Sequence, residues 1–504
     1  MLVATTTNSL PLTSKLCPPP KESLILSTVL RVFLIQTASG LFSTSGGHRA
    51  NYYLLSSLAS KGHTCRSFVL CSKNDLLSAH VDNYTEEQYC FGNEKNKVRI
   101  YRFVWNGVEI VAPEHDDYIK VFPPGSSFSR PFDDLEKRKK RWMENKELFP
   151  EYDAYVNFIT NELVSLHATH FIFNDSVALK IASTLPSSIC RIFICHACEH
   201  LSFGPYAGVP GFCSTSSPFE YKWLKEIEGV WAVSRAVKEY IGTYGEEVRA
   251  THLPLHPAIF GEVPFKKYCN FEAPYVVSIN PGSYKGYSIF KKLAERNKDI
   301  RFAAVKSWNV SDYQLKELKK IKNVKVLMPF KDMEKLWSQV KVLLVPSLWY
   351  EAFGLVVVEA MLHGIPVICS DVGGLPEAKC GVSFGTISVN IITGERETDE
   401  LNIKNLGIYK IPPQNIEPWE QALRYLINER DNYERISQEC YDKANSFVQG
   451  INPNIYEKWL IELKQDQKLL LGYKLRSVDF HSKKDSIETK ETNAINRRTA
   501  SVIR

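Results

Sequence analysis

Residues 345–377 read VPSLWYEAFGLVVVEAMLHGIPVICSDVGGLPE and carry the strongest pattern in the chain. An apolar run predicts a strand that ends at Pro346, and a loop carrying Glu351 follows it. Gly354 then opens a predicted helix that contains Glu359. The first N–H groups of a helix have no intrahelical partner and attract phosphate, while both carboxylates can accept hydrogen bonds from sugar hydroxyls. The stretch therefore predicts a strand–loop–helix site for a diphosphate that carries sugar groups.

Two glutamates eight positions apart also arise as chance spacing on a solvated surface. Three flanking segments that contain glycine make the pattern around this pair specific, and chance then becomes a poor explanation. These segments are Phe353-Gly354, Gly364-Ile365-Pro366-Val367 and Gly373-Gly374-Leu375-Pro376-Glu377.

Short apolar strands alternate with helical segments on both sides of this stretch. Such alternation is typical of parallel sheets whose two faces are covered by helices. We therefore predict an α/β protein with two parallel halves, joined around 255–272, where prolines cluster. The expected segments are a disordered lead at 1–26, an N-terminal half at 27–265, a C-terminal half at 266–448, a helix at 449–472 whose return to the N-terminal half is left open, and a disordered tail at 473–504.

Within the N-terminal half, residues 136–166 have the pattern of one long helix that opens with a basic run at 137–141. This run fits a solvated helix face or contact with an anionic surface, and both interpretations stay open. The apolar stretch at 24–34 resembles a signal-peptide core, but Arg31 lies inside it, and we interpret it as the first strand. No run of about 18 uncharged apolar residues occurs elsewhere, so we expect no transmembrane helix.

The composition is that of a folded globular protein, with 504 residues, 44% of them hydrophobic and 23% charged. A formal charge of +6, from 62 basic and 56 acidic residues, is too small over this length to indicate a nucleic-acid-binding protein. The twelve cysteines are scattered, which is typical of reduced thiols. We expect a cytoplasmic protein, and peripheral contact with a membrane is left open.

Several common motifs are missing from the sequence. It contains no G-x-x-x-x-G-K-[ST], no G-x-G-x-x-G after a strand and no G-x-S-x-G. The sequence therefore lacks the motifs expected for P-loop hydrolysis, ordinary dinucleotide binding and α/β-hydrolase chemistry. The sequence also lacks Asp-x-Asp, the usual holder of a divalent ion on a nucleotide diphosphate.

Taken together, these segments resemble the retaining glycosyltransferases of family 4, in the group 1 glycosyl transferases. The E-x7-E motif of that family stands here as Glu351 to Glu359. The resemblance covers roughly residues 28–450 and includes Gly46-Gly47, residues 230–237 and residues 280–286. It implies the GT-B fold, in which two Rossmann-like domains face each other across a cleft. The N-terminal domain would then bind the acceptor and the C-terminal domain the nucleotide-sugar donor.

The family also implies roles for the residues of the main motif. Glu351 would contact hydroxyls of the transferred sugar, and Glu359 those of the nucleotide ribose. Phe353, Gly354 and Leu355 would present their backbone to the diphosphate.

Lys285 would neutralise the leaving diphosphate, a role that otherwise falls to a metal ion. A solvated lysine after a turn is the alternative for this residue. Many relatives carry a Gly-Arg pair just after the preceding strand, whereas this chain has Ile279-Asn280. Asn280 therefore stands in the donor loop without a charge, and a second cation must come from elsewhere, such as Lys306.

In the N-terminal half, Gly46 and Gly47 predict a loop that phosphate or acceptor can approach closely, because no side chain blocks the backbone. A plain tight turn is the alternative. His196 follows a predicted strand and matches a family histidine that faces the sugar or acceptor. A structural histidine is the alternative here, since the usual His-Asp pairing is absent. Residues 195–200, CHACEH, also allow a zinc interpretation, although no second ligand pair follows.

The resulting hypothesis is a glycosyltransferase that moves a sugar from a UDP- or GDP-sugar to an acceptor hydroxyl with retention of configuration. The catalytic candidates are Glu351, Lys285 and His196, and no cofactor or divalent metal is expected. The acceptor is left open among a glycan, a lipid and a small molecule. A GT-B epimerase or phosphorylase and a non-catalytic nucleotide-sugar binding protein remain as alternatives.

Overall fold

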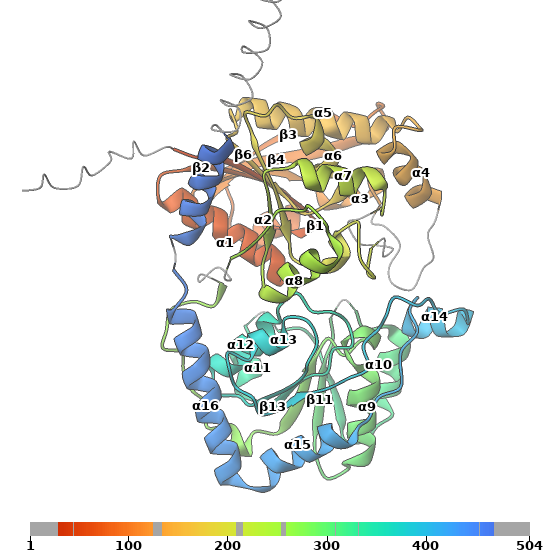
Figure 1. The fold of residues 1–504 in the computed structure, drawn as a ribbon, viewed down its shortest axis with the longest axis vertical. Coiled ribbons are helices and arrows are strands. Elements are labelled where there is room, and N and C mark those ends of the chain that lie inside the picture. The colour runs from red at the N-terminus through yellow and green to blue at the C-terminus, as the bar shows by residue number, and fades with distance from the viewer. Residues whose placement is uncertain are drawn as a thin grey trace, which may run out of the picture.

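The computed structural model describes residues 29–43, 45–123, 134–207, 215–253, 259–307, 309–330, 332–452 and 454–467. Figure 1 shows two α/β units, one above the other, with the earlier part of the chain in the upper unit. The predicted α/β class with two halves is confirmed. The expectations for residues 1–26 and 473–504 lie outside the described residues, and the domain boundaries stay predictions.

The N-terminal unit is built on a sheet whose described strands run in the order β3-β4-β5-β2-β1-β6-β7-β8-β9. All neighbours from β5 to β9 pair in parallel, whereas β3, β4 and β5 pair antiparallel. The strands are β1 (Arg31–Gly40), β2 (Thr64–Leu70), β3 (Thr85–Cys90), β4 (Lys97–Trp105), β5 (Val108–Pro113), β6 (His170–Phe173), β7 (Cys190–Cys195), β8 (Gly229–Ala232) and β9 (Ala250–His252).

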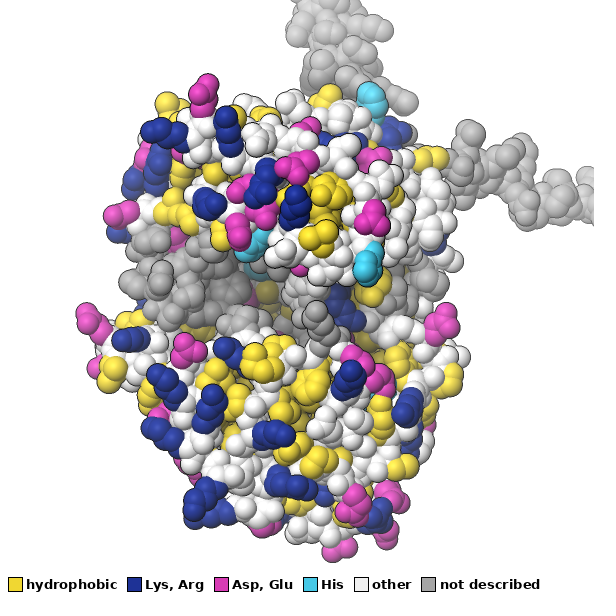
Figure 2. All heavy atoms as spheres, turned by 180° about the vertical axis from the view of Figure 1, so that it is seen from behind, with side chains coloured by type: hydrophobic (Ala, Val, Ile, Leu, Met, Phe, Trp, Pro, Cys, Tyr) yellow, Lys and Arg dark blue, Asp and Glu magenta, His cyan; other side chains and the backbone are white. Residues whose placement is uncertain are grey.

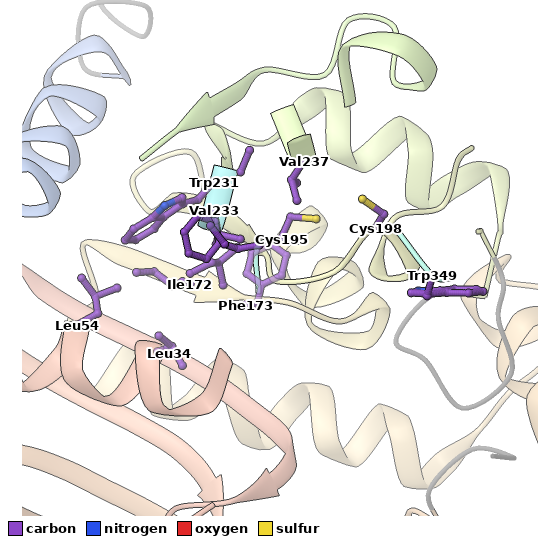
Figure 3. Packing of buried hydrophobic residues seen from close by; sticks show 14 of the residues in the cluster. Leu34, Leu54, Ile172, Phe173, Cys195, Cys198, Trp231, Val233, Val237 and Trp349 are labelled. Carbon is purple, nitrogen blue, oxygen red and sulfur yellow. The ribbon is translucent and has the colours of Figure 1, made fainter. Parts of the chain in front are cut away.

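Helices cover both faces of this sheet, as expected for a parallel sheet made of apolar strands. They are α1 (Gly46–Ser60), α2 (Lys73–Ser78), α3 (His115–Val121), α4 (Asp134–Met143), α5 (Pro150–Ser165), α6 (Ser176–Thr184), α7 (Pro218–Glu226) and α8 (Arg235–Tyr244), with a 3-10 turn η1 (Cys198–His200). Figure 3 shows the core between them, where Leu54 of α1 and Val237 of α8 pack against strand residues such as Ile172.

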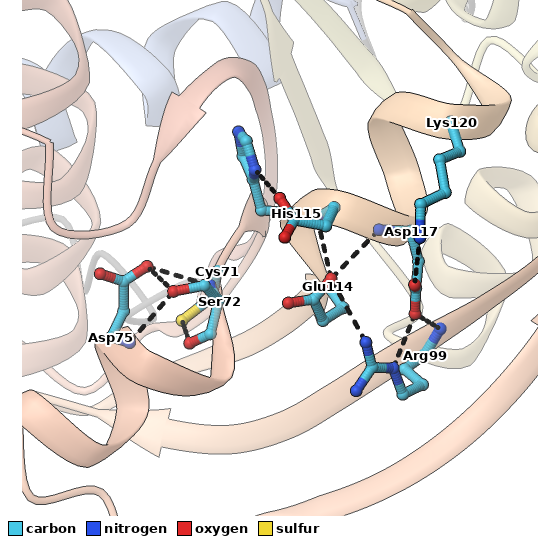
Figure 4. A network of polar contacts seen from close by, with 9 residues as sticks. Cys71, Ser72, Asp75, Arg99, Glu114, His115, Asp117 and Lys120 are labelled. Carbon is cyan, nitrogen blue, oxygen red and sulfur yellow. Dashed lines mark hydrogen bonds and ion pairs between the residues drawn. The ribbon is translucent and has the colours of Figure 1, made fainter.

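The antiparallel strands β3 and β4 extend the sheet beyond its parallel part, and no pattern in the sequence analysis predicts them. A polar network ties this extension to α3 (Figure 4). Arg99 of β4 donates to Asp117 at 2.6 Å and lies 3.5 Å from Glu114. The Glu114 carboxylate also accepts the backbone N–H groups of Asp116 and Asp117, which caps the start of α3.

The prediction of one long helix over 136–166 is wrong, because α4 ends at Met143 and α5 begins at Pro150. Proline has no N–H to donate and disfavours helical geometry in the residue before it, so it suits the first position of a new helix. Phe149 accordingly has φ −139° and ψ 82°. Two residues of the basic run, Arg138 and Arg141, pair with Glu147 in the turn between the helices.

The C-terminal unit has a parallel sheet in the order β12-β11-β10-β13-β14-β15. Its strands are β10 (Tyr275–Ile279), β11 (Phe302–Val305), β12 (Val324–Leu327), β13 (Val340–Val345), β14 (Val367–Ser370) and β15 (Thr386–Ile387). Its helices are α9 (Tyr287–Arg296), α10 (Asp312–Lys319), α11 (Glu334–Trp337), α12 (Leu355–Leu362), α13 (Leu375–Ala378), α14 (Glu400–Leu406), α15 (Glu417–Asn428) and α16 (Arg430–Gln449), with 3-10 turns η3 (Asn270–Glu272) and η4 (Ser283–Lys285).

The end of the described chain returns to the N-terminal unit as a helix over 455–467. Trp459 packs on Trp231 of β8 with ring centroids 5.4 Å apart. The Leu460 carbonyl lies 3.0 Å from the buried His170 ring, and Glu457 pairs with Lys61 at 2.9 Å. The two units are thus linked by the chain at both ends of the C-terminal unit.

Candidate functional site

The motif residues of the C-terminal unit lie on loops that follow β10, β13 and β14, at the carboxyl edge of its sheet. Ligands of open α/β sheets bind at this edge. Gly286 brings the first two loops together, because a Cβ there would lie 1.9 Å from the Pro346 carbonyl oxygen. The Leu348 N–H also donates to the Tyr284 carbonyl at 2.9 Å. Lys285 is held beside the loop that carries Glu351 as a result.

Lys285 and Glu351 form an ion pair, with Nζ 2.5 Å from Oε1. The same carboxylate oxygen accepts the Ser347 hydroxyl at 2.6 Å. Both charged side chains keep some exposure, 25% for Lys285 and 16% for Glu351. An ion pair within reach of solvent can exchange partners with a ligand, so the pair can offer a cation and a hydrogen-bond acceptor at one point.

Helix α12 begins directly after this loop. Its N-cap residue Gly354 has φ +108°, a conformation that glycine adopts readily, and no side chain caps the helix. The first N–H groups of α12 are therefore open to an anion. Phe353 is buried and stacks on Phe447, so the segment before the helix is fixed by packing.

The N-terminus of α1 faces α12 from the other unit. A Cβ at Gly46 would lie 2.4 Å from Cδ1 of Leu355, and one at Gly47 would lie 3.0 Å from Cγ of His196. Gly46 and Gly47 form the first turn of α1, so the prediction of a loop there is wrong. Two helix N-termini without side-chain caps lie close together at the junction of the units, and the approach of phosphate or acceptor to the two glycines stays a prediction.

His196 lies at this junction, just after β7, and its Nε2 lies 2.7 Å from Oδ1 of Asn51 on α1. Burial, with smaller contributions from the nearby His200 and His48, lowers the pKa of His196 to about 3. Burial also lowers the pKa of His48 and of His200 to about 4. His196 is therefore neutral at physiological pH, where it can exchange hydrogen bonds with hydroxyl groups but carries no charge.

Asn280 has a structural task in the loop that follows β10. It adopts φ +59°, which asparagine tolerates better than most residues, and its Oδ1 accepts the Asn309 N–H at 3.0 Å. The side chain therefore fixes a neighbouring loop and supplies no charge.

Two charged residues at the junction escaped the sequence analysis. Arg49 of α1 donates to Glu359 of α12 at 3.1 Å and to the Ile259 carbonyl at 2.9 Å. Glu199, in η1, is 6% exposed, and its Oε2 has no hydrogen-bond partner among the described residues. Burial raises the pKa of Glu199 to about 7, while the charges of Lys285 and Glu351 act on it in opposite directions. No local motif marks either residue, because Arg49 pairs with the other unit and Glu199 is distinguished only by its burial.

The zinc interpretation of residues 195–200 gains no support. In the described part of the chain, no three or more His, Cys, Asp or Glu side chains are grouped to hold a metal ion. Burial raises the pKa values of the Cys195 and Cys198 thiols, which is the opposite of what a thiolate ligand needs. Within the same residues, no helix combines the length and the apolar character needed to cross a bilayer.

Solved structures resemble this chain over almost its whole described length. Sucrose-phosphate synthase from Thermosynechococcus elongatus has a TM-score of 0.56 at 15% identity, covering 88% of this chain and 99% of that chain. HepE from Anabaena, in complex with UDP and glucose, has a TM-score of 0.50 at 15% identity, covering 85% and 99%. The fold is therefore that of the GT-B glycosyltransferases, as predicted.

Residues 282–401, which hold the Lys285 and Glu351 loops, match the family described as Glycosyl transferases group 1. Within the C-terminal unit, these residues therefore form a domain that matches this glycosyl transferase family. An uncharacterized 42.6 kDa protein in the cps region of Klebsiella pneumoniae is 36% identical over 93 residues, 18% of this chain and 25% of that protein. A 41.2 kDa protein of the same region is 51% identical over 47 residues, 9% of this chain and 13% of that protein. The chain thus matches a quarter or less of these curated relatives.

Proposed function

We propose that this protein is a retaining glycosyltransferase of family 4, which transfers a sugar from a nucleoside-diphosphate sugar to an acceptor hydroxyl. The observation that carries the proposal is the Lys285–Glu351 pair beside the open N-terminus of α12, opposite the N-terminus of α1. This arrangement offers positive charge to a diphosphate and a carboxylate to a sugar within one site.

The donor would lie with its diphosphate at the first N–H groups of α12. Glu359, one turn further along, would accept the ribose hydroxyls, and Glu351 would accept hydroxyls of the transferred sugar. Lys285 would exchange part of its contact with Glu351 for the diphosphate oxygens. These fixed charges and dipoles would stabilise the negative charge that develops when the bond between sugar and phosphate breaks.

Retention of configuration follows if the acceptor attacks from the face that the diphosphate leaves. The bond from the anomeric carbon to the phosphate oxygen breaks, the acceptor oxygen bonds to that carbon, and the acceptor proton passes to the departing phosphate oxygen. This balance needs no nucleophile from the protein. Neutral His196 would orient a hydroxyl of the sugar or acceptor without competing for the proton.

Several properties of the reaction belong to the same proposal. The donor is a UDP- or GDP-sugar. In support, HepE was solved in complex with UDP and glucose, and a mutant of S. aureus TarM with fondaparinux, α-GlcNAc-glycerol and UDP. No divalent metal is needed, because Lys285 and the helix N-termini take its role. The acceptor is a glycan, a lipid or a small molecule. The protein acts in the cytoplasm, in solution or at a membrane surface.

The decisive experiment measures nucleoside-diphosphate release from a panel of UDP-, GDP- and ADP-sugars, with and without EDTA. We expect release from a UDP- or GDP-sugar that persists in EDTA and falls at least about a hundredfold in Glu351→Gln and Lys285→Ala. NMR of the product made with an accepted acceptor should show the anomeric configuration of the donor.

A matched control is the carboxylate Asp299, which pairs with Arg424 at 2.6 Å at the opposite edge of the same sheet. Asp299→Asn should keep full turnover. Equal losses in Glu351→Gln and Asp299→Asn would contradict the assignment of the site. Donor binding without any turnover would favour a nucleotide-sugar binding protein, and sugar-phosphate formation from inorganic phosphate would favour a phosphorylase.

A further inference from the structure

Arg49 occupies a position between the two helix N-termini. It is the fourth residue of α1, one turn after Gly46, whose backbone approaches Leu355 at the start of α12. Its guanidinium reaches across the junction to Glu359 and to the Ile259 carbonyl. The side chain is 32% exposed, so solvent and ligands can reach it.

The guanidinium lies within a short distance of the predicted diphosphate position. Glu359 is four residues after Leu355, which is about 6 Å along the helix axis at 1.5 Å per residue. Helical side chains lean towards the N-terminus, so the Glu359 carboxylate and the guanidinium beside it lie closer to that end than the Glu359 backbone does. A change of rotamer in the long arginine side chain spans the remaining distance between the guanidinium and the diphosphate.

The charge balance of the site leaves room for this cation. Lys285 shares its charge with Glu351, and Asn280 brings none. A nucleoside diphosphate carries at least two negative charges on adjacent phosphates. A planar guanidinium that donates from several N–H groups matches such a pair of phosphates better than one ammonium group does.

We propose that Arg49 is the second cation of the donor site and that it binds the donor diphosphate from the opposite unit. The inference rests on the proposed function. The ribose hydroxyls and Arg49 share Glu359, since a carboxylate accepts several hydrogen bonds, and the second N–H face of the guanidinium turns to the phosphate. Binding of the diphosphate then also holds the two units together.

The test compares a nucleoside diphosphate with its monophosphate in calorimetric titrations of the full chain. UDP with UMP and GDP with GMP serve as probes for the wild type, Arg49→Gln and Arg49→Lys. We expect Arg49→Gln to weaken diphosphate binding by about tenfold or more and monophosphate binding by less than about threefold. Arg49→Lys should recover part of the loss. Arg424→Gln, which removes a paired arginine on α15, should change neither.

The outcomes separate this inference from the function on which it rests. The role of Arg49 would be overturned if Arg49→Gln lost diphosphate and monophosphate binding equally, lost neither, or bound the diphosphate more tightly. In each of these cases, binding of a nucleoside diphosphate by the wild type would still support the proposed donor class. Tighter binding would mean that the Arg49–Glu359 pair obstructs the ribose. If the wild type binds no nucleoside diphosphate, the proposed donor fails and this inference fails with it.

Discussion

Gly373 supports the loop that carries Glu351, and adding one methyl group there tests whether the position of this carboxylate controls turnover. Gly373 has φ +58°, and a Cβ on it would lie 2.3 Å from the Glu351 carbonyl oxygen and 2.7 Å from its nitrogen. The next residue, Gly374, donates its N–H to the same carbonyl at 2.8 Å. Gly373→Ala must therefore move the backbone of Glu351 itself.

The size of the movement follows from the contact distance. Ordinary van der Waals contact begins at 3.4 Å, so the carbonyl must retreat by about 1 Å from 2.3 Å. A shift of that size stretches the 2.5 Å contact between Glu351 and Lys285 to the limit of a hydrogen bond. Misplacement of a reacting group by about 1 Å costs about a hundredfold in rate. The positive φ adds about 1–2 kcal/mol of strain for alanine.

Gly381 provides the matched control. Its φ is +90°, and a Cβ there would meet no atom within 4 Å, so Gly381→Ala carries the backbone strain without the displacement. Both variants should lose stability in urea denaturation, and Gly373→Ala should lose more, because it adds the displacement to the backbone strain. Gly373→Ala alone should lose about a hundredfold in donor turnover at saturating donor. Turnover of Gly373→Ala within about threefold of Gly381→Ala would refute the reasoning.

Three further predictions concern two groups buried near the junction and the half-buried ring of Trp459. Burial raises the pKa of Glu199 to about 7, so the folded protein keeps this proton while the unfolded chain loses it above about pH 4.5. In urea denaturation, Glu199→Gln should therefore match wild-type stability at pH 4 and exceed it by roughly 3 kcal/mol above pH 7. Burial lowers the pKa of His196 to about 3, so below pH 6.5 the unfolded chain binds more protons than the folded protein. The melting temperature of the wild type should therefore fall as the pH drops below 6.5, and it should fall less in His196→Asn. Trp459→Ala removes the ring that packs on Trp231, so it should lower the free energy of unfolding by about 2–3 kcal/mol and expose the chain after α16 to proteolysis. An unchanged digestion pattern would contradict the role of the helix over 455–467.

The parallel parts of both sheets could be predicted because their strands are short apolar runs. The strand His170–Phe173 is buried at every position, and such a run needs helices on both faces. Strand β3, with the sequence TEEQYC, is mostly exposed and has neither an apolar run nor a buried face. It exists because its backbone pairs with β4 at the edge of the sheet, and that pairing leaves no signal in its own composition.

The start of α1 illustrates a second limit. Two glycines in a row are poor helix formers, so the local sequence indicates a loop at Gly46-Gly47. Tertiary contacts overrule this preference, because the helix must approach Leu355 and His196 more closely than any residue with a Cβ allows. The predicted secondary structure was thus wrong at these glycines, while the predicted approach of phosphate or acceptor stays a prediction.

Residues that act across the junction lie beyond what local patterns can predict. Lys285 and Glu351 follow neighbouring parallel strands, so their approach can be inferred from the order of strands in one unit. Arg49 and Glu359 are 310 positions apart in the chain and belong to different units. Their contact depends on how the units are set against each other, which no spacing within either unit encodes.

Two carboxylates of the C-terminal unit make polar contacts across the junction. Glu359 holds Arg49, while Glu377 accepts the Arg235 backbone N–H at 2.8 Å and lies 3.4 Å from the His252 ring. Glu377 belongs to the glycine-containing motif that also supports the Glu351 loop. A ligand that draws Arg49 or Glu359 into its own contacts therefore acts directly on one of these links, and the site and the contact between the units are built from the same residues.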